Sequence, residues 1–200
     1  MEGSVVIAVE RFLVSSDTRD EWLEVRKRGV TATQVAKAAT PAGFKEVLAS
    51  VRSGESVEPN AYMQWGVDRE AYIAHYVKER FGVMPNSWLI CAEGLGNEWM
   101  MATPDGLSGD HKIIGEYKTS GKSLSRIPLN YMRQIQFQLM VTGAEQCVFA
   151  WEQRLEGPYG FVPGLEIETQ VVDRDEKMIK SLIEVAERLQ QEFVFDSWVD

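Results

Sequence analysis

The sequence has few cysteines, no excess of basic residues and no long apolar run, and each of these shortages excludes a class of protein. Its two cysteines, Cys91 and Cys147, are too few for a disulfide framework, which favours a reduced, intracellular protein. No stretch approaches the roughly 20 apolar residues that a membrane-spanning helix needs. The N-terminus lacks the basic and apolar regions of a secretory signal. We therefore expect a cytoplasmic protein with no membrane association.

The net charge of −9 argues against a protein that binds nucleic acid over its whole surface. The charge is uneven, however. Eight acidic and four basic residues lie between Asp173 and Asp200, whereas five basic and two acidic residues lie between Gly109 and Gln136. A second basic cluster is Arg26–Arg28. A solvated face is the alternative for each cluster, but we interpret both as local phosphate-binding surfaces.

The two histidines form no zinc pattern with the cysteines, so we expect no zinc site. We predict that His75 lies on a helix surface and that His111 is an exposed residue in a turn before a strand.

The chain has no internal repeat and no long linker, which predicts a single domain over residues 1–200. Asp17 or Thr18 is a candidate cap for the first helix, and Trp22, Leu23 and Val25 are its candidate core contacts. Helices are predicted at about 17–28, 33–39, 44–52, 60–81, 129–142 and 173–195, and a loop at 53–60. Strands are predicted at about 87–92, 98–102, 113–118, 146–152 and 166–172. The order indicates an α/β (α+β) fold, with a helical N-terminal part followed by a small mixed sheet flanked by helices.

The stretch ATPDGLSGDHKIIGEYKTS, residues 102–120, contains the candidate chemistry. Glu116 and Lys118 project from the same face of the predicted strand because strand residues i and i+2 do so. Asp105 joins them if the intervening loop folds back. Carboxylates suit Mg²⁺, for which Asp105, Glu116 and the main-chain carbonyl of Tyr117 are candidate ligands. Lys118 can orient or deprotonate a metal-bound water, which suits attack on a phosphodiester.

Three further polar residues lie among apolar neighbours. Glu70 shares a helical face with Ile73 and Val77, where an ionised acid is costly unless it is paired or binds a metal. We interpret it as a third acid of the same site, and a buried salt bridge to an arginine is the alternative. Gln134 and Gln136 lie on the helix predicted at 129–142. The amide of Gln136 can hold a phosphate, a water or a catalytic carboxylate, and a helix-boundary hydrogen bond is the alternative.

Taken together, five motifs resemble the phage lambda exonuclease family, the YqaJ-type viral recombinases, which belong to the PD-(D/E)XK nuclease superfamily. The motifs are W-x3-R-x2-GVTAT (22–33), MQWGVDRE (63–70), ATPDGL (102–107), GEYKT (115–119) and MRQIQFQLMVTG (132–143). The resemblance covers about residues 22–188 and includes VVDRDEKM (171–178). It implies a restriction-endonuclease-like core and a 5′→3′ exonuclease that acts on double-stranded DNA ends and leaves a 3′ single strand. It also implies a phage- or prophage-encoded protein in a bacterial host.

The resemblance assigns roles to individual residues. Asp105 and Glu116 match the metal-binding acids, Lys118 the catalytic lysine, Glu70 the acid that completes the site and Gln136 the active-site glutamine. The expected cofactor is Mg²⁺, with Mn²⁺ as a substitute and two ions per site. Residues that match positions for the terminal 5′-phosphate or other DNA contacts are Arg26, Thr33, Thr103 and Gln134.

Two positions depart from the family pattern. Thr33 stands where serine is common, which gives a stiffer rotamer. The phosphate-binding arginine expected after the catalytic lysine does not align, and Lys122 or Arg126 is the candidate substitute.

The expected partners follow from the resemblance and from the charge. A chain with net charge −9 that stays on DNA between cuts can enclose the duplex, and the resembled family forms ring-shaped trimers. We therefore expect a homotrimer whose channel is less acidic than its outer surface, together with a single-strand annealing protein as a partner.

Two alternatives to the exonuclease function are an endonuclease or nickase of the same superfamily and a non-catalytic binding module. The second is disfavoured because every expected catalytic residue is present.

Overall fold

The computed structural model describes residues 6–54 and 60–196. Most of the loop predicted at 53–60 therefore lies outside the described residues. The helices are η1 (Val9–Arg11), α1 (Arg19–Arg26), α2 (Ala32–Ala38), α3 (Pro41–Ser53), α4 (Ala61–Phe81), α5 (Leu129–Thr142) and α6 (Glu176–Asp196). The strands are β1 (Phe12–Ser15), β2 (Val30–Thr31), β3 (Val83–Pro85), β4 (Trp88–Cys91), β5 (Met100–Ala102), β6 (Gly106–Ser108), β7 (Ile113–Ser120), β8 (Gln146–Gly157) and β9 (Gly160–Asp173).

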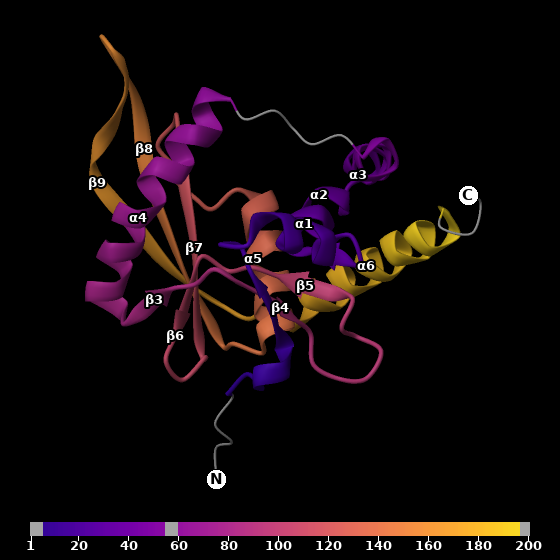
Figure 1. Ribbon diagram of the computed structural model, residues 1–200. Coiled ribbons are helices and arrows are strands. Elements are labelled where there is room, and N and C mark those ends of the chain that lie inside the picture. Colours follow the sequence, from indigo (N-terminus) through magenta and orange to yellow (C-terminus); the bar gives the residue numbers. More distant parts are fainter. Residues whose placement is uncertain (1–5, 55–59, 197–200) are drawn as a thin grey trace.

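The strands form two mixed sheets rather than one (Figure 1). The larger sheet has the order β3-β6-β7-β8-β9, in which β7 and β8 run parallel and the other pairs are antiparallel. The smaller sheet has the order β1-β4-β5-β2, with β2 parallel to β5. The predicted mixed α/β fold with flanking helices is confirmed, and the second sheet adds to it.

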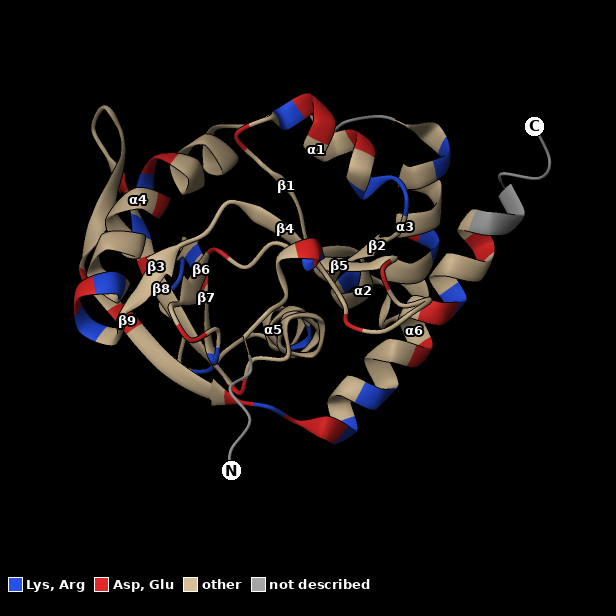
Figure 2. Ribbon diagram, turned by 60° about the horizontal axis from the view of Figure 1, so that its bottom comes forward, with Lys and Arg blue, Asp and Glu red and all other residues tan. Residues whose placement is uncertain are grey.

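Helix α5 lies between the two sheets, and Figure 2 shows it end-on at the centre of the molecule. Its apolar residues Ile135, Phe137 and Leu139 are fully or almost fully buried. Helix α4 covers the opposite face of the larger sheet, where Ile73 and Val77 pack with Tyr117 and with residues of β8. The larger sheet therefore has a helix on each face, and β7 lies between them.

The predicted elements and the structure differ most where strands are short. The sequence pattern does not predict β1, β2, β3 and β6, which have only two to four residues each. So few residues cannot show a clear alternation, and pairing with longer strands determines their conformation. The first predicted helix cap is wrong, because the side chain of Thr18 does not cap α1 and Asp17 instead accepts a hydrogen bond from Ser15. Leu23 is exposed rather than part of the core.

The last helix begins later than predicted, at Glu176 rather than near Asp173. Asp173 still belongs to β9, where it pairs with Gln146 of β8. The carboxylate of Asp175 accepts hydrogen bonds from the N–H groups of Lys177 and Met178, as a helix cap does.

The charged segments lie mostly at the surface (Figure 2). Both signs alternate along the exposed face of α6, whereas its apolar residues Ile179, Leu182 and Leu189 are buried. The basic segment 109–136 does not form one patch. Lys112 pairs with Glu145 before the start of β7, and the other basic residues are distributed along β7, the following loop and α5. No described helix is long and apolar enough to cross a membrane.

Gly106 and Gly115 have no side chains that would clash with the Tyr117 ring beneath α4. A Cβ atom on Gly106 would lie 2.4 Å from the Tyr117 hydroxyl oxygen and 2.7 Å from a methyl carbon of Val83. A Cβ atom on Gly115 would lie 2.5 Å from the same oxygen. These contacts are far inside van der Waals distance. The glycines that follow Asp105 and precede Glu116 are thus needed for packing between β6 and β7.

We expect Gly106→Ala to destabilise the protein by about 1–3 kcal/mol, because it overpacks a buried contact. The melting temperature should fall by about 2–4 °C for each kcal/mol. Gly109→Ala is the matched control, since its added methyl group would meet open space and should be neutral. Combining Gly106→Ala with Tyr117→Phe should recover part of the loss. Equal melting temperatures for the two glycine variants would contradict this packing role.

Candidate active site

Strand β7 places an acid and an amine together on the face that packs against α5. Glu116 is fully buried, and its Oε1 atom forms an ion pair with the Lys118 Nζ atom. The two residues point the same way because they are two apart on the strand. Burial of a charged pair is costly unless further hydrogen bonds satisfy the remaining lone pairs. The site should therefore contain more polar partners for Glu116.

Helix α5 supplies these partners as two glutamines one helical turn apart. The Nε2 atom of Gln134 donates to Oε1 of Glu116, and the Nε2 atom of Gln138 donates to Oε2, each at 2.7 Å. Residues i and i+4 share a helix face, so the pair can hold both oxygens of one carboxylate. The sequence analysis did not select Gln138. Its spacing from Gln134 is the signal that could have identified it.

Gln136 does not lie at this carboxylate, contrary to the role that the resemblance assigns to it. Its Nε2 atom donates to the main-chain oxygen of Asp173 at 2.8 Å, and its Oε1 atom accepts from the N–H of Asp175 at 2.7 Å. Two residues along a helix turn the side chain by about 200°, so Gln136 faces away from the side of Gln134. The alternative of a helix-boundary hydrogen bond is confirmed, and it links α5 to the start of α6.

Asp105 reaches the same region from the short connection before β6. Its Oδ2 atom accepts a hydrogen bond from the N–H of Tyr117 at 2.6 Å, and its own N–H donates to the carbonyl of Gly115 at 2.9 Å. The loop between Asp105 and Glu116 thus folds back as predicted. The C=O of a strand residue points to the same side as its N–H. The Tyr117 carbonyl therefore lies on the Asp105 side of β7, as its candidate role as a metal ligand requires.

Glu70 approaches the site from α4. The residue is exposed, yet nearby protein atoms partly desolvate its carboxyl group and raise its pKa. Lys118 opposes this shift and the charge of Glu116 adds to it, so Glu70 lies within electrostatic reach of both groups. The alternative for Glu70 was an ion pair with an arginine, but Arg69, its neighbour in sequence, pairs with Glu152.

The acids at this site repel one another. Burial raises the pKa of Asp105 well above its ordinary value, and the negative charges of Glu116 and Glu70 add to the shift. Lys118 and the hydrogen bond from Tyr117 oppose it. A cation would relieve this repulsion, so the donor set of two acids and a carbonyl fits a hard divalent ion. Among the described residues, no three His, Cys, Asp or Glu side chains converge closely enough to hold a metal ion together.

Lys118 is protonated and positively charged in the protein without a bound metal. Burial lowers its pKa, but the negative charges of Glu116 and Asp105 outweigh burial, and the resulting pKa lies above the ordinary value. Lys118 is therefore an ammonium group at neutral pH, held between two carboxylates.

The three residues proposed for the terminal phosphate lie on or near the smaller sheet. Strands β2 and β5 run parallel, so Thr33 and Thr103 both follow the same end of the sheet, and Asp105 lies two residues beyond Thr103. Thr33 is exposed. The guanidinium carbon of Arg26 lies 4.0 Å from the ring centroid of Trp22, and burial lowers the pKa of Arg26.

Lys122 and Arg126 are exposed in the connection between β7 and α5. His75 lies on the exposed side of α4, as predicted. His111 lies in the turn before β7, as predicted, but it is half-buried rather than exposed. Its Nδ1 atom accepts a hydrogen bond from the N–H of Ile7 at 2.8 Å, and its ring packs edge-on against Phe12.

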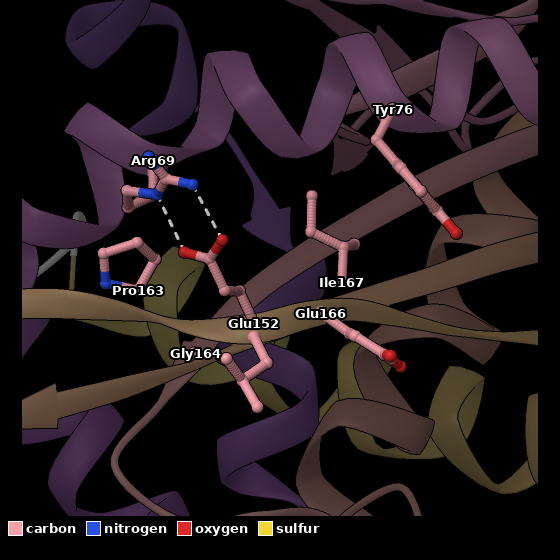
Figure 3. Close-up of a pocket in the computed structure, with 8 residues that line it drawn as sticks. Arg69, Tyr76, Glu152, Pro163, Gly164, Glu166 and Ile167 are labelled. Carbon is pink, nitrogen blue, oxygen red and sulfur yellow. Dashed lines mark hydrogen bonds and ion pairs between the residues drawn. The ribbon is translucent and has the colours of Figure 1, made fainter.

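A separate pocket of about 460 Å³ lies between α4 and β9 (Figure 3). Arg69 and Glu152 face each other in it and form two hydrogen bonds of 2.7 Å each. Neither Asp105, Glu116 nor Lys118 lines this pocket. We interpret the ion pair as a link that fixes α4 to β8 beside the acid site.

We expect Asp105→Asn to raise the melting temperature at pH 7 in the absence of divalent ions. Because the pKa of Asp105 is raised on folding, its ionisation opposes folding, and this cost grows as the pH rises above the unfolded value of about 3.9. Asparagine can still accept the hydrogen bond from Tyr117 but carries no charge. Thermal melts between pH 4 and pH 8 should show the difference widening with pH.

Asp110→Asn is the matched control, with the opposite sign. A hydrogen bond from Ser108 lowers the pKa of Asp110, so its ionisation favours folding and its replacement should lower the melting temperature near neutral pH. A lower melting temperature for Asp105→Asn at pH 7 would contradict the repulsion inferred among the acids.

Three crystal structures are similar in fold: LHK-Exo in complex with dAMP (TM-score 0.68, 23% identity, 88% of this chain and 93% of that chain), an alkaline exonuclease (LHK-Exo) from Laribacter hongkongensis (0.64, 21%, 89% and 96%) and a phage-related exonuclease from Haemophilus somnus 129PT (0.63, 16%, 86% and 96%). No curated protein sequence matches significantly. The family model of the YqaJ-like viral recombinase domain matches residues 21–145, which include Asp105, Glu116 and Lys118. The chain belongs to the YqaJ-like viral recombinase domain family.

Proposed function

We propose that the chain is a metal-dependent exonuclease that digests one strand of double-stranded DNA from its 5′ end and leaves a 3′ single strand. The observation that carries this proposal is the buried Glu116 carboxylate, held beside the Lys118 ammonium and next to Asp105. Proteins of similar fold support the choice, because they include exonucleases and a complex with dAMP, a deoxynucleotide of the class that an exonuclease releases.

Asp105, Glu116 and the Tyr117 carbonyl are the groups that would hold Mg²⁺ or Mn²⁺, and Glu70 would be the candidate ligand of a second ion. When bound, the metal supplies positive charge that stabilises the extra negative charge of a phosphodiester under attack. Gln134 and Gln138 keep the Glu116 carboxylate in one orientation. Lys118 is positioned to donate a hydrogen bond to a phosphate oxygen or to orient a water.

The expected products follow from the bonds that change. A water oxygen bonds to phosphorus, the bond from phosphorus to the 3′ oxygen breaks, and that oxygen takes up a proton. The released nucleotide keeps its 5′-phosphate, and the shortened strand begins with a new 5′-phosphate. A site that holds a terminal 5′-phosphate would therefore meet the same group after every cut.

We expect Asp105→Ala, Glu116→Ala and Lys118→Ala each to abolish Mg²⁺-dependent digestion of a linear duplex, because each variant removes a charged group of the site. Calcium should support DNA binding with little cleavage, since its larger and more flexible coordination shell holds reacting groups less well. Release of nucleotides from 5′-labelled duplex is the measurement.

Two controls sharpen that experiment. Asp110→Ala removes an exposed acid in the turn between β6 and β7 and should keep wild-type activity. A covalently closed circular duplex should stay intact, and its cleavage would favour an endonuclease or nickase. Near wild-type turnover by a purified, folded Lys118→Ala variant would contradict the assignment of the site.

We further propose that Arg26 and Thr33 hold the terminal 5′-phosphate, with Thr103, Lys122 or Arg126 as additional donors. The Thr31 hydroxyl donates to Gln34 at 3.0 Å, whereas the Thr33 side chain in the first turn of α2 is exposed. The stacked guanidinium of Arg26 can bind a phosphate through two parallel hydrogen bonds.

Arg26→Ala should slow digestion of 5′-phosphorylated ends about ten- to a hundredfold more than digestion of 5′-hydroxyl ends. This range corresponds to a charge-assisted hydrogen bond of about 1.5–3 kcal/mol. Lys27→Ala is the control, because Lys27 is an adjacent exposed cation paired with Glu24, and it should slow both substrates slightly and equally. Equal losses on both substrates with Arg26→Ala would make Arg26 a structural residue or a general backbone contact.

We also propose a ring-shaped homotrimer and a single-strand annealing protein as a partner. The support is family membership together with the net charge of −9, which disfavours tight DNA binding by one subunit. In such a ring the basic segments would face a shared channel and the mixed-charge face of α6 would lie outside.

A further inference from the structure

Helix α4 lies beside the hairpin formed by β8 and β9 (Figure 1). Two aromatic rings and an arginine meet between the start of the helix and the hairpin. Tyr62 of α4 stacks on Phe161 of β9, with ring centroids 5.2 Å apart and an interplanar angle of 28°. The guanidinium carbon of Arg154 on β8 lies 4.4 Å from the Tyr62 centroid and 4.9 Å from the Phe161 centroid. We call these three residues the aromatic platform.

The platform is held in place, and no described part of the chain covers it. Trp65 supports it from the same helix, with its ring 5.9 Å from Phe161 in an edge-to-face arrangement. Tyr62 nevertheless keeps 54% of its surface exposed. Tyrosine loses little conformational entropy on binding and presents a wide, flat surface. A pre-stacked, exposed tyrosine is therefore suited to receive another planar ring.

Two elements place the platform beyond the acid site along the same part of the sheet. On α4, Tyr62 precedes Glu70 by eight residues, about 12 Å along the axis. Gly121, the residue after the end of β7, follows Lys118 by three residues, about 10 Å in extended chain. The helix crosses the strand at Gly66, whose added Cβ would lie 3.8 Å from the Thr119 hydroxyl, and Arg154 lies against Gly121. Both paths run from Glu70 and Lys118 toward the platform, which lies on the α4 face of the sheet, whereas the side chains of Glu116 and Lys118 point to the α5 face.

The platform itself carries a positive charge, whereas the exposed charges around it are of both signs. Arg154 contributes a cation at the platform, and the exposed Lys122 follows the end of β7. Two exposed acids lie close by: Asp68, which accepts a hydrogen bond from Gln64, and Glu156, which pairs across the hairpin with Phe161. Stacking surfaces next to cations are the usual elements of single-strand binding.

We propose that the aromatic platform binds unpaired bases of a DNA strand next to the cleavage site. The inference rests on the proposed nuclease function, because it assigns the strand to the DNA that enters that site. A path of about 10–12 Å corresponds to roughly three stacked nucleotides at 3.4 Å each. Every base has a flat face, so the platform should bind without sequence preference.

The test measures binding of a fluorescent 20-nucleotide oligothymidine by anisotropy in EDTA, so that cleavage does not interfere. Tyr62→Ala should weaken binding about 5- to 100-fold, the range for loss of one stacked base, without changing the dependence on salt. Tyr62→Phe should retain the affinity. Arg154→Gln should weaken binding and lower the salt dependence by about one ion. Glu156→Gln should tighten binding because it removes a nearby negative charge.

Tyr159→Ala is the matched control, since Tyr159 is a fully exposed tyrosine on the same hairpin, and it should bind like the wild type. Unchanged affinity of a folded Tyr62→Ala variant would overturn the proposal. So would a change in the mass of that variant by light scattering with unchanged DNA affinity, which would make the platform a contact between chains. If the wild type binds the oligonucleotide through Tyr62 but does not digest duplex DNA, the proposed nuclease function fails and the platform proposal stands.

Discussion

The buried carboxylate of Glu116 is the group on which the arrangement of this molecule depends. It lies on a central strand, under a helix, where water cannot solvate its charge. Lys118, Gln134 and Gln138 replace that water, and they require β7 and α5 to keep one relative position. A charge without these partners would be strongly destabilising. The requirement to satisfy Glu116 therefore links the packing of the core to the geometry of the site.

The same constraint explains why α5 lies between the two sheets. One of its faces presents two glutamines to β7, and other residues of the helix join the apolar core shared by the smaller sheet, α2 and α6. Gln136, between the two glutamines in sequence, faces away from Gln134 and ties the helix to the first residues of α6. Every glutamine of this helix is thus committed to a specific neighbour, two of them to the acid site.

One edge of β7 is unpaired at the site, which leaves main-chain groups of the strand accessible there. Strand β6 pairs with β7 only up to Gly115, so the N–H and C=O of Tyr117 are free of a neighbouring strand on that side. Asp105 binds the N–H, and the carbonyl lies beside it. At this edge burial raises the pKa of Asp105, and the negative charges of Glu116 and Glu70 add to the shift. Such stored repulsion is typical of sites that bind a cation.

The sequence by itself determined the long elements and the chemistry carried on one strand. The spacing of Glu116 and Lys118 predicts a shared face, because strand geometry is local, and the helices at 61–81 and 129–142 follow from composition and period. Only the tertiary structure decided which glutamines face Glu116, since the two sides of a buried helix are equally rich in apolar neighbours and look alike in sequence. The tertiary structure also decided the second sheet, because its short strands form only through pairing between distant segments. It likewise decided the contact among Tyr62, Arg154 and Phe161, which depends on how α4 packs against the hairpin.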